Sequence, residues 1–160
     1  MESPAAIYKE SAVQGMEHFL TVFSFVPDDK LTWTPSPTAK SAIRIAAHTA
    51  LYAGIFAQMI KDRKLPDSGS LQEWIARRDA AEAAITCRTD IGPVFRKGTA
   101  EVIAALDSVP LEAFATSLDS GSGWSMPMTF LMNLPGIHAR DHSAQIDYLQ
   151  TCWNDQVVHF

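Results

Sequence analysis

The chain has 160 residues, of which 47% are hydrophobic and 19% are charged, so it is long enough to form one domain, residues 1–160, with a sizeable core. Its formal net charge of -5 at pH 7 argues against a nucleic-acid-binding surface, because such surfaces concentrate Lys and Arg in a basic patch. We recognise neither a signal peptide nor an apolar run of the roughly 20 residues needed to cross a bilayer, and therefore expect a cytoplasmic protein without a membrane partner.

The first half of the chain predicts three helices. Apolar residues at helical spacing indicate a first helix over residues 5–26, which Pro27 ends. A proline-containing loop follows, and Ser41 is suited to be the N-cap of a second helix over residues 42–63. A shorter helix is predicted over residues 71–85.

Two more helices are predicted in the second half. One covers residues 91–109, with Pro93 near its start, where proline is tolerated. Residues 119–127 indicate a loop, and residues 128–153 indicate a long helix with a kink at Pro135. Since no stretch alternates with a period of two, we predict an all-α protein, a four-helix bundle with a short extra helix between helices two and three.

Three histidines occupy inward positions of the predicted bundle. His138 and His142 are one helical turn apart, so both project from one face of the last helix. His48 lies between Ile45 and Tyr52 on the apolar stripe of the second helix. Burying an imidazole without a partner costs on the order of 1–3 kcal/mol, so each ring needs a hydrogen bond, a water or a metal. One metal ion would satisfy all three, and a hydrogen-bonded core histidine is the alternative for each.

Other histidines and cysteines do not extend this group. His18 and His159 are expected at the surface, and Cys87 and Cys152 are expected to be reduced, partly buried thiols. The chain contains no HExxH, Glu-x-x-His or CxxCH sequence, which excludes a zincin protease site, a ferritin-like di-iron site and covalent haem. A metal site here would therefore be mononuclear and rich in histidine.

Two stretches resemble the DinB-like superfamily, the DinB/YfiT-like metalloenzymes. They are "VPDDKLTWTPSPTAKSAIRIAAHTA", residues 26–50, and "HARDHSAQIDYLQ", residues 138–150. The resemblance implies a four-helix bundle of DinB/YfiT type that binds one divalent metal, with Zn or Ni as first candidates and Fe, Co or Mn as others. Where members often read His-Arg-Gly-Gln, this chain has Ser143 and Ala144 in place of Arg and Gly. The implied metal ligands are His48, His138 and His142.

Three neutral nitrogen ligands leave open positions on a divalent ion, which lowers the pKa of a bound thiol or water toward neutrality. The resemblance implies a homodimeric enzyme that uses a low-molecular-weight thiol, such as bacillithiol or mycothiol, for transfer or isomerisation of a small-molecule substrate, or that hydrolyses its substrate. The alternative is a non-catalytic stress-response or interaction bundle with a structural or vestigial metal. A structural zinc normally has four protein ligands, and spacing indicates only three.

Four further residues are candidates for roles at the site. Asp141 and Gln145 each lie three residues after one of the paired histidines, where a side chain could orient a ring or a water during catalysis. Trp33 and Trp124 lie in two predicted loops that could close over one end of the bundle and line a pocket. The alternatives are that Asp141 is a solvent-exposed helix residue without a role at the site and that Trp33 packs in the core.

Overall fold

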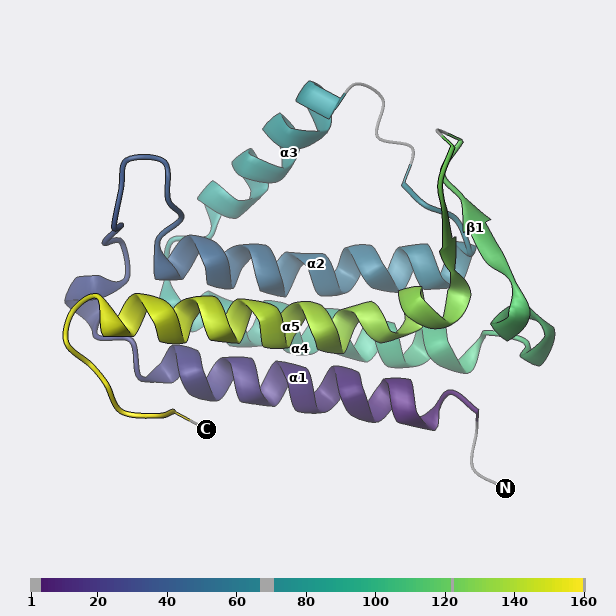
Figure 1. Ribbon diagram of the computed structural model, residues 1–160, viewed down its shortest axis with the longest axis horizontal. Helices are drawn as coiled ribbons and strands as arrows, with labels where there is room; N and C mark the ends of the chain where they lie inside the picture. The colour runs from purple at the N-terminus through teal and green to yellow at the C-terminus, as the bar shows by residue number, and fades with distance from the viewer. Residues whose placement is uncertain (1–3, 67–70, 122, 160) are drawn as a thin grey trace.

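A computed structural model describes residues 4–66, 71–121 and 123–159 of the chain (Figure 1). The single predicted domain, and the expected absence of a signal peptide, also involve residues outside these ranges, about which the structure says nothing. In chain order the elements are α1 (Ala6–Ser24), η1 (Asp28–Lys30), α2 (Ala42–Asp62), α3 (Leu71–Ala84), α4 (Arg88–Asp107), η2 (Leu111–Ala115), β1 (Ser117–Asp119), β2 (Ser125–Pro127) and α5 (Met128–Thr151).

The predicted all-α fold is confirmed: α1, α2, α4 and α5 are long helices packed side by side, and α3 is the short extra helix between the second and third of them (Figure 1). Ser41 is the residue before α2, as predicted, although its side chain makes no capping hydrogen bond. The helix α5 continues through Pro135. The largest fully buried side chains of the core are Phe19, Ile60, Ile91, Leu106, Met128, Leu131, Met132 and Ile146.

The helix α4 begins at Arg88, three residues before the predicted start at residue 91. The sequence placed Pro93 in the first turn, but it lies further inside the helix. The cause is tertiary. Arg88 donates from Nη1 to the carbonyl oxygen of Phe23 (2.9 Å) and from Nη2 to that of Val26, which fixes the start of α4 against the end of α1.

These contacts also define the direction of the helices. Both α2 and α4 begin at the end of the bundle where α1 finishes, and the ion pair between Lys9 and Asp107 joins the start of α1 to the end of α4 at the opposite end. Helices α2 and α4 therefore run parallel, and α1 and α5 run the other way. The chain must return along the bundle between α2 and α4, and α3 makes that return above α2 (Figure 1).

The predicted loop over residues 119–127 is wrong in part, because it includes a small antiparallel hairpin. β1 pairs with β2 so that Leu118 lies opposite Met126. Gly121 (φ 70°) and Gly123 (φ 92°) have left-handed backbone conformations at the turn, which glycine adopts without a steric penalty. With three residues in each strand, the hairpin is too short to show the alternation by which strands are recognised in a sequence.

The helix α2 is long and apolar enough, by length and composition, to cross a membrane, contrary to the expectation that no segment would approach this limit. Within the qualifying window, 61% is buried inside the bundle. Helix α2 contacts both α4 and α5, so the apolar residues along it form part of the core. A core helix and a membrane span share this composition, and the packing accounts for it here.

Two expectations about side-chain exposure are wrong. His159 is buried, since its ring stacks on Phe25 with centroids 4.2 Å apart and its Nε2 lies 2.9 Å from Asp155 Oδ2. Position near the end of the chain suggested exposure, but this segment packs against the end of α1. Cys87 and Cys152 are free thiols as predicted, yet both are exposed.

Helices α1 and α5 approach closely where each has a glycine. A Cβ atom added to Gly136 would lie 2.2 Å from Ser11 Oγ and 2.6 Å from Ser11 O, and one added to Gly15 would lie 2.9 Å from Gly136 O. Real side chains do not approach backbone atoms so closely, so the spacing of the two helices requires glycine at these positions.

We predict that Gly136→Ala lowers the free energy of unfolding by about 1–3 kcal/mol, because α1 and α5 must move apart, even though alanine favours a helix by up to about 1 kcal/mol. The matched control is Gly54→Ala, where the added Cβ meets only Glu101 Oε2 at 3.5 Å. This control should be neutral or stabilising. Urea unfolding measures both, and equal stability of the two variants would contradict the close approach.

Candidate metal centre

The three inward histidines converge, as predicted. His138 Nε2 lies 3.2 Å from His48 Nε2 and 3.1 Å from His142 Nε2. All ligand nitrogens of the group are within 4.8 Å of one another, so the three side chains could bind one metal ion. The rings come together because α2 packs on α5, while His138 and His142 are one turn apart on α5.

Hydrogen bonds fix which nitrogen two of the rings present to the centre. His48 Nδ1 lies 2.7 Å from Glu82 Oε1, and His142 Nδ1 lies 2.8 Å from Gln145 Oε1. Each oxygen accepts the Nδ1–H proton, so Nε2 of His48 and of His142 carries a lone pair directed at the centre. The second hydrogen bond involves Gln145, one of the residues that the sequence predicted for orienting a ring.

Glu82, from α3, is the functional residue that the sequence analysis missed. Its side chain is 1% exposed, and its carboxylate is surrounded by positive groups. Lys40 Nζ lies 2.5 Å from Oε2, Arg44 Nη2 lies 3.5 Å from Oε2, and Arg78 Nε lies 3.5 Å from Oε1. Burial alone would raise the pKa of this carboxyl, but the hydrogen bonds from Lys40 and His48 outweigh burial and lower it. Glu82 is therefore ionised near neutral pH.

No spacing rule could connect Glu82 with His48, because the two residues lie 34 positions apart on different helices. One local signal was present in the sequence "RRDAAEAA". Glu82 has two alanines on each side, and Arg78, four residues earlier, forms an ion pair with it.

Burial lowers the pKa of all three histidines. For His138, burial and the neighbouring rings of His142 and His48 lower the pKa to about 3. For His48 and His142, burial is the largest cause, and the hydrogen bonds that the two rings donate to Glu82 and Gln145 oppose it only in part. The three rings are consequently neutral at pH 7, which is the protonation state in which imidazole binds a metal.

Aromatic side chains cover one side of the centre. The ring of Tyr52 stacks on that of His138, with centroids 5.1 Å apart, and Phe56 meets the same ring edge-on at 5.2 Å. Trp74 of α3 contacts Tyr52 in turn, with centroids 6.4 Å apart. These contacts limit access of water from this side and explain why the pKa of His138 is lowered furthest.

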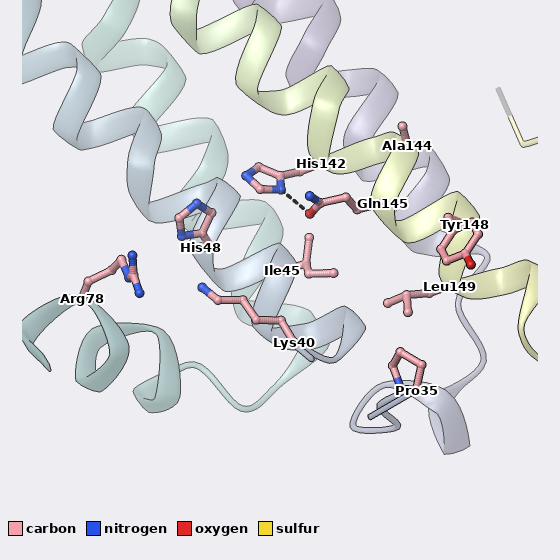
Figure 2. A pocket seen from close by; sticks show the side chains of 10 residues that line it. All are labelled: Pro35, Lys40, Ile45, His48, Arg78, His142, Ala144, Gln145, Tyr148 and Leu149. Carbon is pink, nitrogen blue, oxygen red and sulfur yellow. Dashed lines mark hydrogen bonds between the residues drawn. The ribbon is translucent and has the colours of Figure 1, made fainter. Parts of the chain in front are cut away.

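The other side of the centre opens into a cavity of about 690 Å³ (Figure 2). His48 and His142 line its inner end, and Gln145 lies beside them. The size falls within the range of small-molecule binding sites. The remaining lining residues are Pro35, Lys40, Ile45, Arg78, Ala144, Tyr148 and Leu149.

Asp141 is exposed and makes no hydrogen bond to the His142 ring among the described contacts. Its negative charge opposes the lowering of the pKa of His142 by burial. Trp33 is half-buried and packs edge-on against Trp153, with ring centroids 5.5 Å apart. Trp124 is 52% exposed and lies in the hairpin. The α1–α2 loop and the hairpin lie at opposite ends of the bundle, so the two tryptophans do not close over one end as expected (Figure 1). Neither tryptophan lines the cavity.

The donor set fits a divalent metal. Two nitrogens bound to one zinc at about 2.0–2.1 Å in tetrahedral geometry lie roughly 3.3–3.4 Å apart, close to the separations of 3.1 and 3.2 Å seen here. Within the described part of the chain, the group contains no fourth His, Cys, Asp or Glu. A metal held by these three rings would therefore keep at least one position for another ligand, on the side of the cavity.

Comparison with known proteins identifies the fold and the family. The chain is similar to a solved structure described as the conserved protein of a locus from Enterococcus faecalis, with a TM-score of 0.68 and 16% identity, over 92% of this chain and 95% of that one. Among curated proteins, none matches significantly. The sequence pattern of the DinB superfamily matches residues 13–146, which include all three histidines. The resemblance noted in the sequence is thus confirmed, and the chain belongs to the DinB superfamily.

Proposed function

We propose that this protein holds one divalent metal ion at His48, His138 and His142 and is an enzyme that uses it to activate a low-molecular-weight thiol, for S-transfer or isomerisation, or a water molecule for hydrolysis. One observation carries the proposal: three neutral imidazoles direct nitrogen atoms at one point, and that point borders a cavity of about 690 Å³. Membership of a metal-binding superfamily supports it.

The chemistry that the metal supplies, when bound, is a lowered pKa for a thiol or water that reaches it, so that a nucleophile forms near neutral pH. The protein's own residues prepare the site. Glu82 and Gln145 hold the rings of His48 and His142 in one tautomer and orientation, and Tyr52 and Phe56 limit access of water from the bundle side. The cavity lined by His48 and His142 has room for a small molecule.

An open cavity favours this function over the alternative, a non-catalytic stress-response or interaction bundle with a structural metal. A structural zinc site is usually closed by a fourth protein ligand, whereas a catalytic site keeps one position open. We further propose zinc or nickel as the metal, a cytoplasmic location and a homodimeric state. Asp141 keeps the assisting role predicted from the sequence as a proposal, whereas the pocket-lining role predicted for Trp33 and Trp124 is not retained, because neither lines the cavity.

The first test is metal retention. We expect protein purified without a nickel column to carry about one equivalent of divalent metal, and His142→Ala to lose it, because two ligands hold a divalent ion weakly. His18→Ala, a half-buried histidine outside the group, is the control and should retain the metal. Elemental analysis measures both. Equal metal content in the two variants would show that the metal is held elsewhere.

The second test concerns Glu82. We expect Glu82→Gln to weaken metal binding by about 10- to 100-fold, since the neutral amide polarises the His48 ring less than a carboxylate does. Asp79→Asn is the matched control, because Asp79 pairs with Arg78 on the same helix but makes no contact with His48. Competition with a chromogenic chelator measures the affinity. An unchanged metal affinity in Glu82→Gln would show that Glu82 stabilises the packing of α3 on the bundle and does not contribute to metal binding.

The third test is turnover. We expect metal-loaded protein to accelerate reaction of a low-molecular-weight thiol with an electrophile, or hydrolysis of an ester or amide, and a chelator to abolish the rate. The rate should rise with pH through an apparent pKa near neutrality, because the deprotonated nucleophile is the reactive form. Panels of thiols with electrophilic acceptors and of ester and amide substrates separate transferase from hydrolase activity.

Loss of turnover on chelation must be reversed when zinc or nickel is added back, which excludes denaturation as its cause. If metal-loaded protein turns over no compound in either panel, and a crystal structure shows a protein side chain in the fourth coordination position, the non-catalytic alternative replaces the enzyme.

A further inference from the structure

We infer that the cavity beside the histidines takes an anionic small molecule, whose carboxylate or similar group lies against Lys40 and Arg78 while its apolar part contacts the opposite wall. This inference rests on the proposed function, because it places the substrate at the same site, and it names the chemical class of that substrate. The observations that carry it are the charges lining the cavity and the arrangement of its walls.

The charged residues that line the cavity all have the same sign. Lys40 and Arg78 line it, whereas no aspartate or glutamate among the described residues does. This positive lining contrasts with the net charge of -5 of the whole chain. A cleft of one sign with low-dielectric walls concentrates ligands of the opposite sign.

The nearby carboxylates do not cancel this charge. Within the ion-paired cluster beside the cavity, Lys40, Arg44 and Arg78 supply three positive charges and Asp79 and Glu82 supply two negative ones, which leaves one positive charge in excess. Asp141, a further carboxylate near His142, is exposed and does not line the cavity. Glu82 lies behind the cavity wall and is almost fully buried, so it holds the cations without facing the ligand. Lys40 and Arg78 remain 35% and 26% exposed.

The cations lie beside the histidines rather than at a remote part of the surface. A single carboxylate links them, since Glu82 Oε2 contacts Lys40 Nζ at 2.5 Å and Glu82 Oε1 contacts His48 Nδ1 at 2.7 Å. Figure 2 shows Lys40 and Arg78 on the same side as His48, and Leu149 and Tyr148 across the cavity. One small molecule can therefore place its reactive end at the histidines, its anionic group at the cations and its carbon chain over the apolar wall.

The test uses two probes that differ only in charge, 6-mercaptohexanoate and 6-mercaptohexanamide, titrated calorimetrically into zinc-loaded protein. We expect the acid to bind at least about tenfold more tightly than the amide, the effect of one charge-assisted hydrogen bond. The six-carbon chain disfavours simultaneous binding of the thiol and the carboxylate by the metal. Comparing the acid-to-amide ratio between variants cancels any difference in thiol acidity.

Lys40→Gln and Arg78→Gln should each reduce the preference for the acid by about fivefold or more, and Lys40→Arg should restore most of it. Arg44→Gln is the matched control, because Arg44 also contacts Glu82 but does not line the cavity. This variant should keep the preference. A wild-type ratio near one, or an equal loss in Arg44→Gln and Lys40→Gln, would overturn the anion site.

Hexanoate and hexanamide, titrated into metal-free protein, separate this inference from the proposed function, because neither compound has a thiol. Suppose that metal-free protein prefers hexanoate in a way that depends on Lys40, and that the thiol of the mercapto compounds adds no affinity in zinc-loaded protein. This result would reject thiol activation and retain the anion site. Thiol-dependent binding without any preference for the acid would reject the anion site and retain thiol activation.

Discussion

The carboxylate of Glu82 is a negative charge taken out of water, and the arrangement around the candidate metal centre follows from its compensation. Removing a carboxylate from solvent costs several kcal/mol unless charge and hydrogen bonds replace the lost hydration. Here one ring N–H and three cations replace it, and they come from α2, the loop before α2, and α3 itself. The same contacts dock α3 on the bundle, orient His48 and place Lys40 and Arg78 at the cavity wall.

This dependence links the position of α3 to the chemistry of the site. The described contacts of α3 with the bundle are mainly with α2. Glu82 contacts His48 directly, and Trp74 and Arg78 of the same helix lie beside Tyr52. Whatever separates α3 from α2 also removes the hydrogen-bond acceptor of His48 Nδ1. An ion bound by His48 would in turn favour the docked position of α3. Metal binding and docking of α3 are coupled through His48, and each of two coupled events stabilises the other by the same free energy.

The sequence was sufficient for those parts of the structure that depend on periodicity. The helices were predicted from the spacing of apolar residues, and the convergence of His48, His138 and His142 followed from their inward positions and the family resemblance. The start of α4 and the burial of His159 could not be predicted, because each depends on a tertiary contact, with the carbonyl groups of Phe23 and Val26 in one case and the ring of Phe25 in the other. Glu82 was missed for the same reason, since its partners are cations and a ring that only the fold brings near.

The parallel course of α2 and α4 has a consequence for how such a site can vary. Because both helices begin at the same end, the chain between them must travel back along a helix of 21 residues, about 30 Å. In this chain the returning segment includes α3, which packs on α2 beside His48. Helices α2 and α5 supply the three imidazoles independently of that return, and the four long helices form one frame. Changing the returning segment would therefore alter the hydrogen-bond acceptor of His48 and the charge of the cavity wall without changing the core of the bundle. The residues that would bind a metal and the residues that would determine ligand specificity thus lie on different parts of the fold.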